Sequence, residues 1–548
     1  MKQTNLIAKT SIWAFSSQIL TKFISFLYLI ILARLLTPEQ IGAFYLVLAI
    51  LGILYIFTDL GLIYSLGRYV PYLYGRKEFA KLKNLVKLSY LGGGVLTLIF
   101  TIVVFLLAGN IADFLNEEKI TPVLQLMAIW ILIKEIDDVS RGILSGRKKI
   151  FECQIMDVIQ NGVKIIITLI AFYLIGFNET ALSIGFLISF ILILPIGVYW
   201  AYKEVKQWPS EEKAFTLKEN IDLGKEVINF GIIITLISLL WTIIQYTDKI
   251  MISYLMPDSL AQIAVYTIAL GLANLILIFP SAIGAVFFPL VSEYFGKNEM
   301  EKIRETINIS IKWSIVTIIP IVAIMILFSQ NLLSIFYGSN YTSGYIVLIL
   351  FTAGLLIRSI FAILSTTLAA MRKLDVEIKS AGAAAISNII FNIIFIPVWG
   401  INGAAFASLL SFIIFSLMIW YYSRKIFGFR FPKEIYKPII AGIIGFLILF
   451  LIKDYIIIGL NEYIPLIQLG ASQGQMADEI AQKMVKLSVF GVLFGLSCVI
   501  YFFSLLILRA FGEDEIEVLE AGLRKIKVPE KYIKLARGIL EAKYLGNH

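Results

Sequence analysis

Long apolar segments are the feature of this chain that most limits its fold. Fourteen stretches follow one another along 548 residues, each close to the roughly 20 apolar residues that a helix needs to cross a bilayer. A soluble protein could not bury so many long apolar segments, because its own surface has to be hydrated. The sequence therefore predicts an all-α integral membrane protein with 14 transmembrane helices.

The fourteen predicted spans are joined by short loops that hold most of the charged residues. Composition agrees with this assignment: 59% of the residues are hydrophobic and 16% are charged, against about 45–50% and about 25% in ordinary globular domains. The spans are Ser11–Leu32, Ile41–Leu66, Leu88–Ala108, Pro122–Leu144, Gln154–Ile175, Leu182–Ala201, Val227–Leu255, Ile263–Leu290, Ile311–Phe328, Gly344–Ala370, Ser380–Val398, Gly403–Tyr422, Pro438–Leu460 and Val485–Leu508.

The basic residues between the spans indicate how the chain is oriented. With a cytoplasmic N-terminus, 37 of the 47 Lys and Arg residues fall on the cytoplasmic side, four fall outside and six lie within spans. Cytoplasmic loops of membrane proteins carry such an excess of positive charge. We therefore expect both termini to be cytoplasmic, and the net charge of +9 reflects topology and does not indicate a nucleic-acid partner.

Two short patterns recur six spans apart. Leu36–Glu39 before the second span resembles Leu255–Asp258 before the eighth, and Leu132–Ile136 in the fourth resembles Leu356–Ile360 in the tenth. An even offset gives both copies the same orientation, which predicts two parallel six-helix lobes around a central cavity. The predicted domains are a first lobe at 1–205, the inter-lobe loop and second lobe at 206–428, helices 13 and 14 at 429–508, and a cytoplasmic amphipathic tail at 509–548.

Four basic residues lie near the middle of predicted spans. They are Lys22, Lys134, Lys164 and Arg358. A charged side chain at this depth costs several kcal/mol unless it faces protein or water, and it usually marks a functional site. These four cations are therefore candidate ligands for an anionic substrate.

Further polar residues share helix faces with these cations or lie in neighbouring spans. Their spacing predicts helices that face a wet cavity, in which the acids could bind a coupling ion. The alternative is internal pairing, Lys134 with Asp138 and Lys164 with Asp157, which would only hold helices together. The candidate cavity and ion-coupling residues are Gln18, Asp59, Glu135, Asp138, Asp157, Asn161 and Asp248.

Several functional classes lack the residues that they require. The chain has one histidine, His548, and two cysteines, which excludes a histidine-based catalytic triad and Cys/His metal sites. It has no phosphate-binding loop of the ATPase type. The longest predicted outer loop, Asn461–Met484, is too short for a catalytic domain. We expect a transporter that is not an enzyme and that needs no metal or cofactor.

Five segments, in order, resemble one known group of transporters. They are Ile31–Phe44, Thr58–Leu62, Thr247–Ile252, Phe336–Tyr341 and Trp399–Ala405. Together they resemble the polysaccharide-transporter branch of the MATE-like flippases, the multidrug/oligosaccharidyl-lipid/polysaccharide superfamily. The resemblance covers nearly all of both predicted lobes, whereas the last two spans and the tail carry no such segment.

The resemblance implies two six-helix lobes in a V around a central cavity. It implies flipping of a sugar on a polyprenyl phosphate or pyrophosphate from the cytoplasmic to the outer leaflet of the plasma membrane, for cell-surface polysaccharide or glycan synthesis. The four cations would bind the anionic headgroup. The implied partners are the lipid-linked sugar, membrane lipids and, as candidates, glycan-assembly enzymes at the cytoplasmic face. The acids of the fourth span, such as Glu135, depart from this pattern.

Three alternatives stay open at this stage. A cation-coupled drug or metabolite exporter of the same superfamily would favour acids and aromatic residues over unpaired cations. An envelope polymerase or glycosyltransferase would need acidic or histidine catalytic groups in a large outer loop. A scaffold or assembly role is the third.

Overall fold

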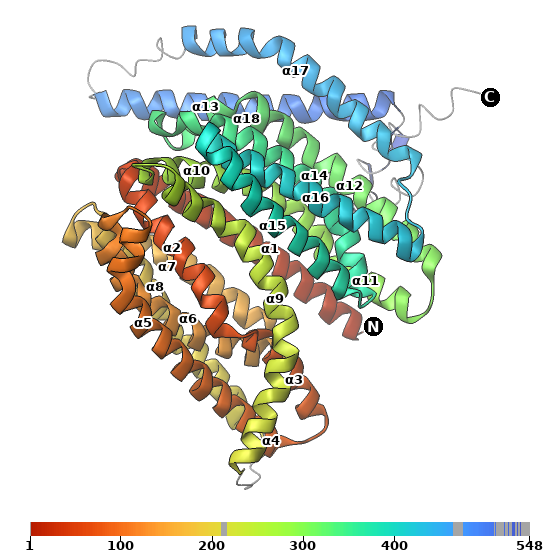
Figure 1. The fold of residues 1–548 in the computed structure, drawn as a ribbon. Helices are drawn as coiled ribbons and strands as arrows, with labels where there is room; N and C mark the ends of the chain where they lie inside the picture. Colours follow the sequence, from red (N-terminus) through yellow and green to blue (C-terminus); the bar gives the residue numbers. More distant parts are fainter. Residues whose placement is uncertain are drawn as a thin grey trace. The chain divides into compact units, whose positions relative to one another are not determined.

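The computed structural model describes residues 2–209, 216–463 and 475–508, with Ala510 and single positions between 520 and 538. All regular structure in these residues is helical (Figure 1). The predicted tail at 509–548 lies almost wholly outside the described residues. The helices are α1 (Lys2–Leu35), α2 (Pro38–Asp59), α3 (Leu62–Gly75), α4 (Phe79–Leu88), α5 (Gly94–Phe114), α6 (Thr121–Gly146), α7 (Ile150–Ile175), α8 (Glu179–Lys206), α9 (Leu217–Leu255), α10 (Leu260–Ala273), α11 (Ile278–Gly296), α12 (Met300–Leu327), α13 (Ser329–Phe336), α14 (Tyr345–Ala370), α15 (Leu374–Trp399), α16 (Ile401–Phe427), α17 (Tyr436–Tyr463) and α18 (Gln475–Ile507).

The chain divides into two compact units. Unit 1 comprises Met1–Ile278, Tyr337–Phe351 and Leu374–Phe415. Within it α6 packs against α3, α5 and α8, while α7 packs between α1 and α8, α2 against α10, and α9 against α2 and α15. Unit 2 comprises Phe279–Phe336, Thr352–Lys373 and Ser416–His548, and in it α17 packs against α12 and α18.

Twelve helical segments in the described part of the chain are long and apolar enough to cross a membrane. Each coincides with one of the fourteen predicted spans. The two remaining predictions fall on α6, which does not reach this standard, and on α18, in which only Gly491–Ile507 forms a shorter apolar helix. The structure is therefore that of an all-helical, multi-pass membrane protein.

Helix α6 differs from its neighbours because five charged residues interrupt its apolar sequence. More than half of its 26 residues are buried, including Glu135, Asp137 and Asp138. The surrounding helices of unit 1 cover it, and burial among protein groups allows a charged helix at a depth where lipid contact would be unfavourable. Its charged residues are the reason why α6 does not meet the apolar standard of the twelve segments.

The predicted second span, Ile41–Leu66, is two helices and not one. Helix α2 starts with a capping box in which Thr37 and Gln40 cap each other's backbone N–H groups, and it ends where Leu60 and Gly61 adopt left-handed conformations, with φ of 46° and 72°. A Cβ atom built on Gly231 of α9 would lie 2.4 Å from the carbonyl oxygen of Leu60. Only glycine fits there, so the α2–α3 junction touches the backbone of α9 directly.

Two other predicted spans also contain irregular turns. A π-helical segment, Ser89–Gly93, precedes α5, and a Cβ on Gly93 would lie 2.5 Å from Oε1 of Glu135. The predicted span Ile263–Leu290 is divided into α10 and α11 by a 3₁₀ segment, Asn274–Leu277. Such interruptions leave no clear signal in hydropathy, because the residues on either side are equally apolar.

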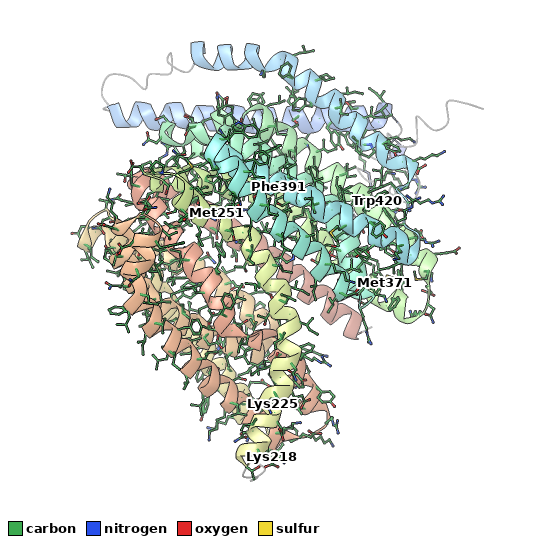
Figure 2. All side chains as sticks on the ribbon, viewed as in Figure 1. Lys218, Lys225, Met251, Met371, Phe391 and Trp420 are labelled. Atoms are coloured by element: carbon green, nitrogen blue, oxygen red, sulfur yellow. The ribbon has the colours of Figure 1, made fainter. Side chains whose placement is uncertain are left out.

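Helix α9 is longer than a bilayer requires. Its 39 residues span about 58 Å at 1.5 Å per residue, whereas the hydrocarbon core is about 30 Å thick. Lys218 and Lys225 project near its N-terminal end, far from Met251 near its C-terminal end (Figure 2). The helix is therefore longer than one crossing of the apolar layer needs.

Candidate functional site

Lys164 of α7 is held among polar and aromatic groups from α1 and its own helix. Its Nζ atom donates to Oδ1 of Asn161 at 2.9 Å and lies 4.5 Å from the centre of the Tyr28 ring. Ser25 donates to the same Asn161 oxygen at 3.1 Å. No carboxylate of the described residues comes within ion-pairing distance of Lys164, so its charge is balanced only by dipoles and a ring face.

Lys22 and Gln18 lie on α1. Lys22 is half-buried and Gln18 is exposed, and in the described part of the chain Lys22 has neither a hydrogen bond nor an ion pair. At 3.6 residues per turn, Lys22 projects about 100° to one side of the stripe through Ser25 and Tyr28 that faces α7. Lys164 projects to the same side of the α1–α7 interface, so the two cations share one flank of it.

Lys134, by contrast, is paired within α6. It forms an ion pair with Asp138, one helical turn along. Tyr55 of α2 donates to the other oxygen of Asp138 at 2.7 Å and to Oε2 of Glu135 at 3.4 Å. Glu135 is 1% exposed, and its Oε1 is buried without a hydrogen-bond partner.

A second ion-paired group lies further along α6. The guanidinium of Arg141 donates to Asp137 at 2.6 Å and to Asp157 of α7 at 2.7 Å. Asp157 thus pairs with Arg141, and the alternative that it neutralises Lys164 is wrong. The physical reason is that the long side chain of Arg141 ends in a planar guanidinium, which can contact a carboxylate on its own helix and one on the next helix at the same time.

Asp59 ends α2 directly before the left-handed junction. Its Oδ2 accepts from the backbone N–H of Gly61 at 3.2 Å, while its Oδ1 is buried without a hydrogen-bond partner. We define the carboxylate cluster as Asp59, Glu135, Asp137 and Asp138. Three of its members keep one buried oxygen unpartnered: Asp59, Glu135 and Asp137.

Asp248 of α9 lies in a separate network, in which the hydrogen-bond donors are neutral. Its carboxylate accepts from Asn392 at 2.7 Å, from Ser408 at 2.6 Å and from the hydroxyl of Tyr266. Asn392 also donates to Asn388 at 3.1 Å. All of these residues belong to unit 1, so four helices, α9, α10, α15 and α16, converge on one buried carboxylate.

Arg358 lies on the part of α14 that belongs to unit 2, where it is half-buried. The other three candidate cations belong to unit 1. No group of three or more His, Cys, Asp or Glu side chains among the described residues is arranged to hold a metal ion. The absence of a metal or cofactor stays a prediction.

Sequence reasoning missed the uncharged members of these clusters. Tyr55 and Tyr266 look like ordinary membrane aromatics, yet Tyr55 lies one turn before Asp59 on the same helix face, which is a usable signal. Ser408 has no comparable signal, because a serine in an apolar helix most often bonds to its own backbone. Arg141 is not among the predicted site residues, although it pairs with two acids.

Solved structures identify the fold. The structure is similar to the lipid II flippase MurJ in an inward closed conformation, with a TM-score of 0.65, 18% identity and coverage of 89% of this chain and 99% of that chain. It is also similar to an inward-facing multidrug resistance MATE family transporter of the MOP superfamily, with a TM-score of 0.63, 16% identity and coverage of 74% and 94%. The fold is therefore a MATE- and MurJ-like helical membrane fold.

Sequence comparison gives the family. The polysaccharide biosynthesis protein family matches residues 7–295, more than half of the chain, and the MatE family matches residues 234–398. The chain belongs to the polysaccharide biosynthesis protein family, as its sequence motifs indicated.

Curated relatives extend over most of the chain. A Haloferax volcanii protein named "Probable low-salt glycan biosynthesis flippase Agl15" is 25% identical over 471 residues, which are 84% of this chain and 92% of that protein. The capsular polysaccharide biosynthesis protein CapF of Staphylococcus aureus is 24% identical, with coverage of 76% and 98%.

Proposed function

We propose that the protein is a flippase that moves a lipid-linked oligosaccharide, a sugar on a polyprenyl phosphate or pyrophosphate, from the inner to the outer leaflet by alternating access. The transported glycan serves cell-surface polysaccharide or glycan synthesis. The observation that carries this proposal is the pair Lys22 and Lys164 at membrane depth, which have no carboxylate partner among the described residues. Family membership and the names of the relatives agree with it.

The headgroup site is proposed to consist of Lys22, Lys134, Lys164 and Arg358. A phosphate at membrane depth needs compensating charge, and lysine and arginine donors supply it through charge-assisted hydrogen bonds. Lys164 is ready for this role because its one polar partner among the described residues is an amide oxygen. Lys134 is not, because it must first leave Asp138, so its recruitment would accompany a conformational change.

Coupling to an ion is proposed for the acids and amides of unit 1. Oxygen ligands that lack hydrogen-bond donors attract a cation or a proton, and buried oxygens of Asp59 and Glu135 have none among the described residues. The candidate set remains Gln18, Asp59, Glu135, Asp138, Asp157, Asn161 and Asp248. In this set Asp248 differs, because neutral donors already occupy both of its oxygens.

The proposed topology has fourteen spans, with α6 and α18 added to the twelve. The two six-helix lobes occupy residues 1–205 and 206–428, helices 13 and 14 occupy 429–508, and both termini face the cytoplasm from the plasma membrane. The tail at 509–548 is proposed as a cytoplasmic amphipathic segment. We further propose that the chain catalyses no covalent reaction and that glycan-assembly enzymes contact its cytoplasmic face.

A cation-coupled exporter of small molecules is the second candidate function. The match of residues 234–398 to the MatE family and the unpartnered carboxylate oxygens of the cluster favour it. An exporter of cationic compounds would bind them at carboxylates, and the loss of Lys22 or Lys164 would leave its transport intact.

Flipping of labelled polyprenyl-phosphate hexose in proteoliposomes separates the two functions. Lys164→Ala should lower the flipping rate tenfold or more, since a charge-assisted bond contributes about 1.5–3 kcal/mol. The matched control is Lys203→Ala, which removes an exposed lysine at the end of α8. Equal rates for wild type and Lys164→Ala would remove Lys164 from the site, and absence of flipping by wild type would refute the proposal.

A further inference from the structure

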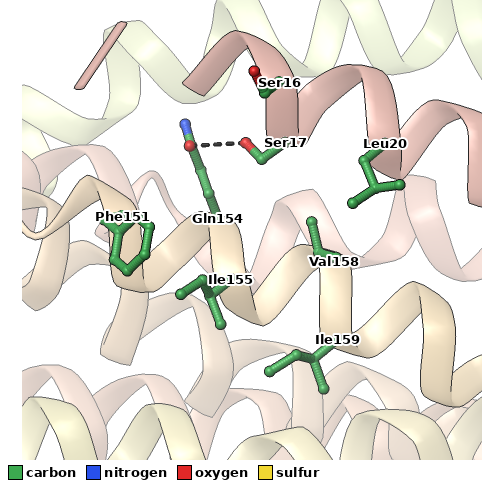
Figure 3. Close-up of a pocket in the computed structure, with 8 residues that line it drawn as sticks. All are labelled: Ser16, Ser17, Leu20, Phe151, Gln154, Ile155, Val158 and Ile159. Atoms are coloured by element: carbon green, nitrogen blue, oxygen red, sulfur yellow. Dashed lines mark hydrogen bonds between the residues drawn. The ribbon is translucent and has the colours of Figure 1, made fainter. Parts of the chain in front are cut away.

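A groove lies between the N-terminal halves of α1 and α7, away from the clusters described above. Its volume is about 170 Å³, below the roughly 300–1,000 Å³ of sites for small molecules, so it is too small for a sugar headgroup. Five of its eight lining residues are apolar, one from α1 and four from α7 (Figure 3). The lining residues are Ser16, Ser17, Leu20, Phe151, Gln154, Ile155, Val158 and Ile159.

Two of the polar groups at the groove bond to each other. Ser17 donates to Oε1 of Gln154 at 2.8 Å across the interface (Figure 3). Further along the same interface Ser25 donates to Asn161 at 3.1 Å, and Tyr28 and Thr168 share a hydrogen bond of 3.2 Å. The two helices are thus joined by a row of neutral side-chain bonds, beside which the groove remains open.

Helix geometry places the groove and the two unpaired cations on opposite flanks of this row. At 100° per residue, Leu20 and Lys22 project about 160° apart on α1, to either side of the stripe that bonds to α7. On α7, Ile155 and Lys164 likewise project to opposite sides of Gln154 and Asn161. Lys22 and Lys164 therefore share one flank, and the groove lies on the other.

The groove flank has the character of a lipid-facing surface. Leu20, Phe151 and Ile159 are 45%, 44% and 38% exposed, and along the same side of α7 the exposed residue Leu169 is also apolar. The flank of the cations leads instead to Asp157 and Arg141 of the ion-paired group. One interface thus separates an apolar surface from a charged one.

We propose that this groove binds a section of the prenyl chain of the lipid-linked substrate while its phosphate reaches Lys22 and Lys164 across the α1–α7 interface. The assignment rests on the proposed flippase function. An amphiphilic anion needs apolar surface for its chain and cations for its phosphate within one molecule's length, and the two flanks of this interface supply both. The weak neutral bonds between α1 and α7 can be exchanged for water or for substrate as the headgroup passes.

Photocrosslinking tests the site directly. p-Benzoylphenylalanine in place of Ile159 should capture labelled polyprenyl-phosphate hexose in phosphatidylcholine vesicles several times more than the same residue in place of Leu169. The two positions are matched, because both are exposed apolar sites on the same side of α7, at 38% and 41%. Equal capture at both positions, or capture at 159 of phosphatidylcholine alone, would overturn the proposal.

Filling the groove gives a second, functional test. Val158→Trp should lower the flipping rate of the labelled lipid by at least about fivefold, because an indole occupies the space of the chain, whereas Leu169→Trp should leave it unchanged. If wild type flips the lipid but neither the capture test nor the flipping test distinguishes the groove positions from Leu169, the groove assignment is wrong while the proposed function stands. If wild type neither flips nor captures it, the proposed function fails as well.

Discussion

Unit 1 buries carboxylates in two ways. Around α6, Arg141 and Lys134 pair with acids, yet oxygens of Glu135 and Asp137 stay unpartnered. Around α9, Asp248 is surrounded by neutral donors, and each of its oxygens accepts a hydrogen bond. Hydrogen bonds from neutral donors stabilise a buried charge without a countercharge. Both carboxylate oxygens of Asp248 are thus bonded, although Oδ1 of the neighbouring Asn392 is buried without a partner among the described residues, whereas around α6 it is carboxylate oxygens that lack a donor.

The difference indicates which of the two carboxylate regions can rearrange. A carboxylate with both oxygens hydrogen-bonded has one favoured arrangement, and altering it costs free energy. A cluster with unpartnered oxygens can gain a proton or a cation, and its ion pairs can then rearrange. Three substitutions test the comparison.

The largest effect is expected for Arg141→Ala. The change leaves Asp137, which is 4% exposed, buried without its cation, and breaking a buried pair costs about 3–5 kcal/mol. Chemical unfolding in detergent measures the loss. The double variant Arg141→Ala with Asp137→Ala should recover part of it, and a single variant as stable as wild type would show that the pairing contributes nothing.

A smaller loss is expected for Asp248→Ala. Donors on Asn392, Ser408 and Tyr266 lose their acceptor, and the relief of burying a carboxylate offsets part of that cost, which gives about 2–4 kcal/mol. The same unfolding measurement applies, with Asp248→Asn as the control that keeps one acceptor oxygen. If Asp248→Ala proved more harmful to stability than Arg141→Ala, the contrast between the two regions would be inverted.

The smallest effect is expected for Gly93→Ala. Its Cβ would lie 2.5 Å from Oε1 of Glu135, and such overpacking costs about 1–3 kcal/mol. Gly92→Ala is the matched control, since a Cβ there meets nothing within 4 Å. The flipping rate should fall for Gly93→Ala only, because the displaced carboxylate belongs to the proposed coupling set. Equal flipping rates for the two variants would show that Glu135 takes no part in transport.

Much of the fold could be predicted from the sequence, because a helix that crosses a membrane appears as a continuous apolar segment of about 20 residues. The break at Leu60–Gly61 could not, since it depends on a backbone contact with Gly231 and not on polarity. The ion pair of Lys134 with Asp138 is one of two interpretations that their spacing allows, the other being a wet cavity. The pairing of Arg141 with Asp157 requires knowing which faces of α6 and α7 meet, which no spacing on a single helix reveals.

Because Leu60 and Gly231 are in direct contact, a movement of α9 would also move the buried carboxylate of Asp59. No side chain separates the two backbones, so α9 cannot slide past the α2–α3 junction unless one of them is displaced. Asp59 is tied to that junction through the N–H of Gly61. Any shift of the long helix is thus transmitted to the Asp59 carboxylate through one backbone contact and one hydrogen bond.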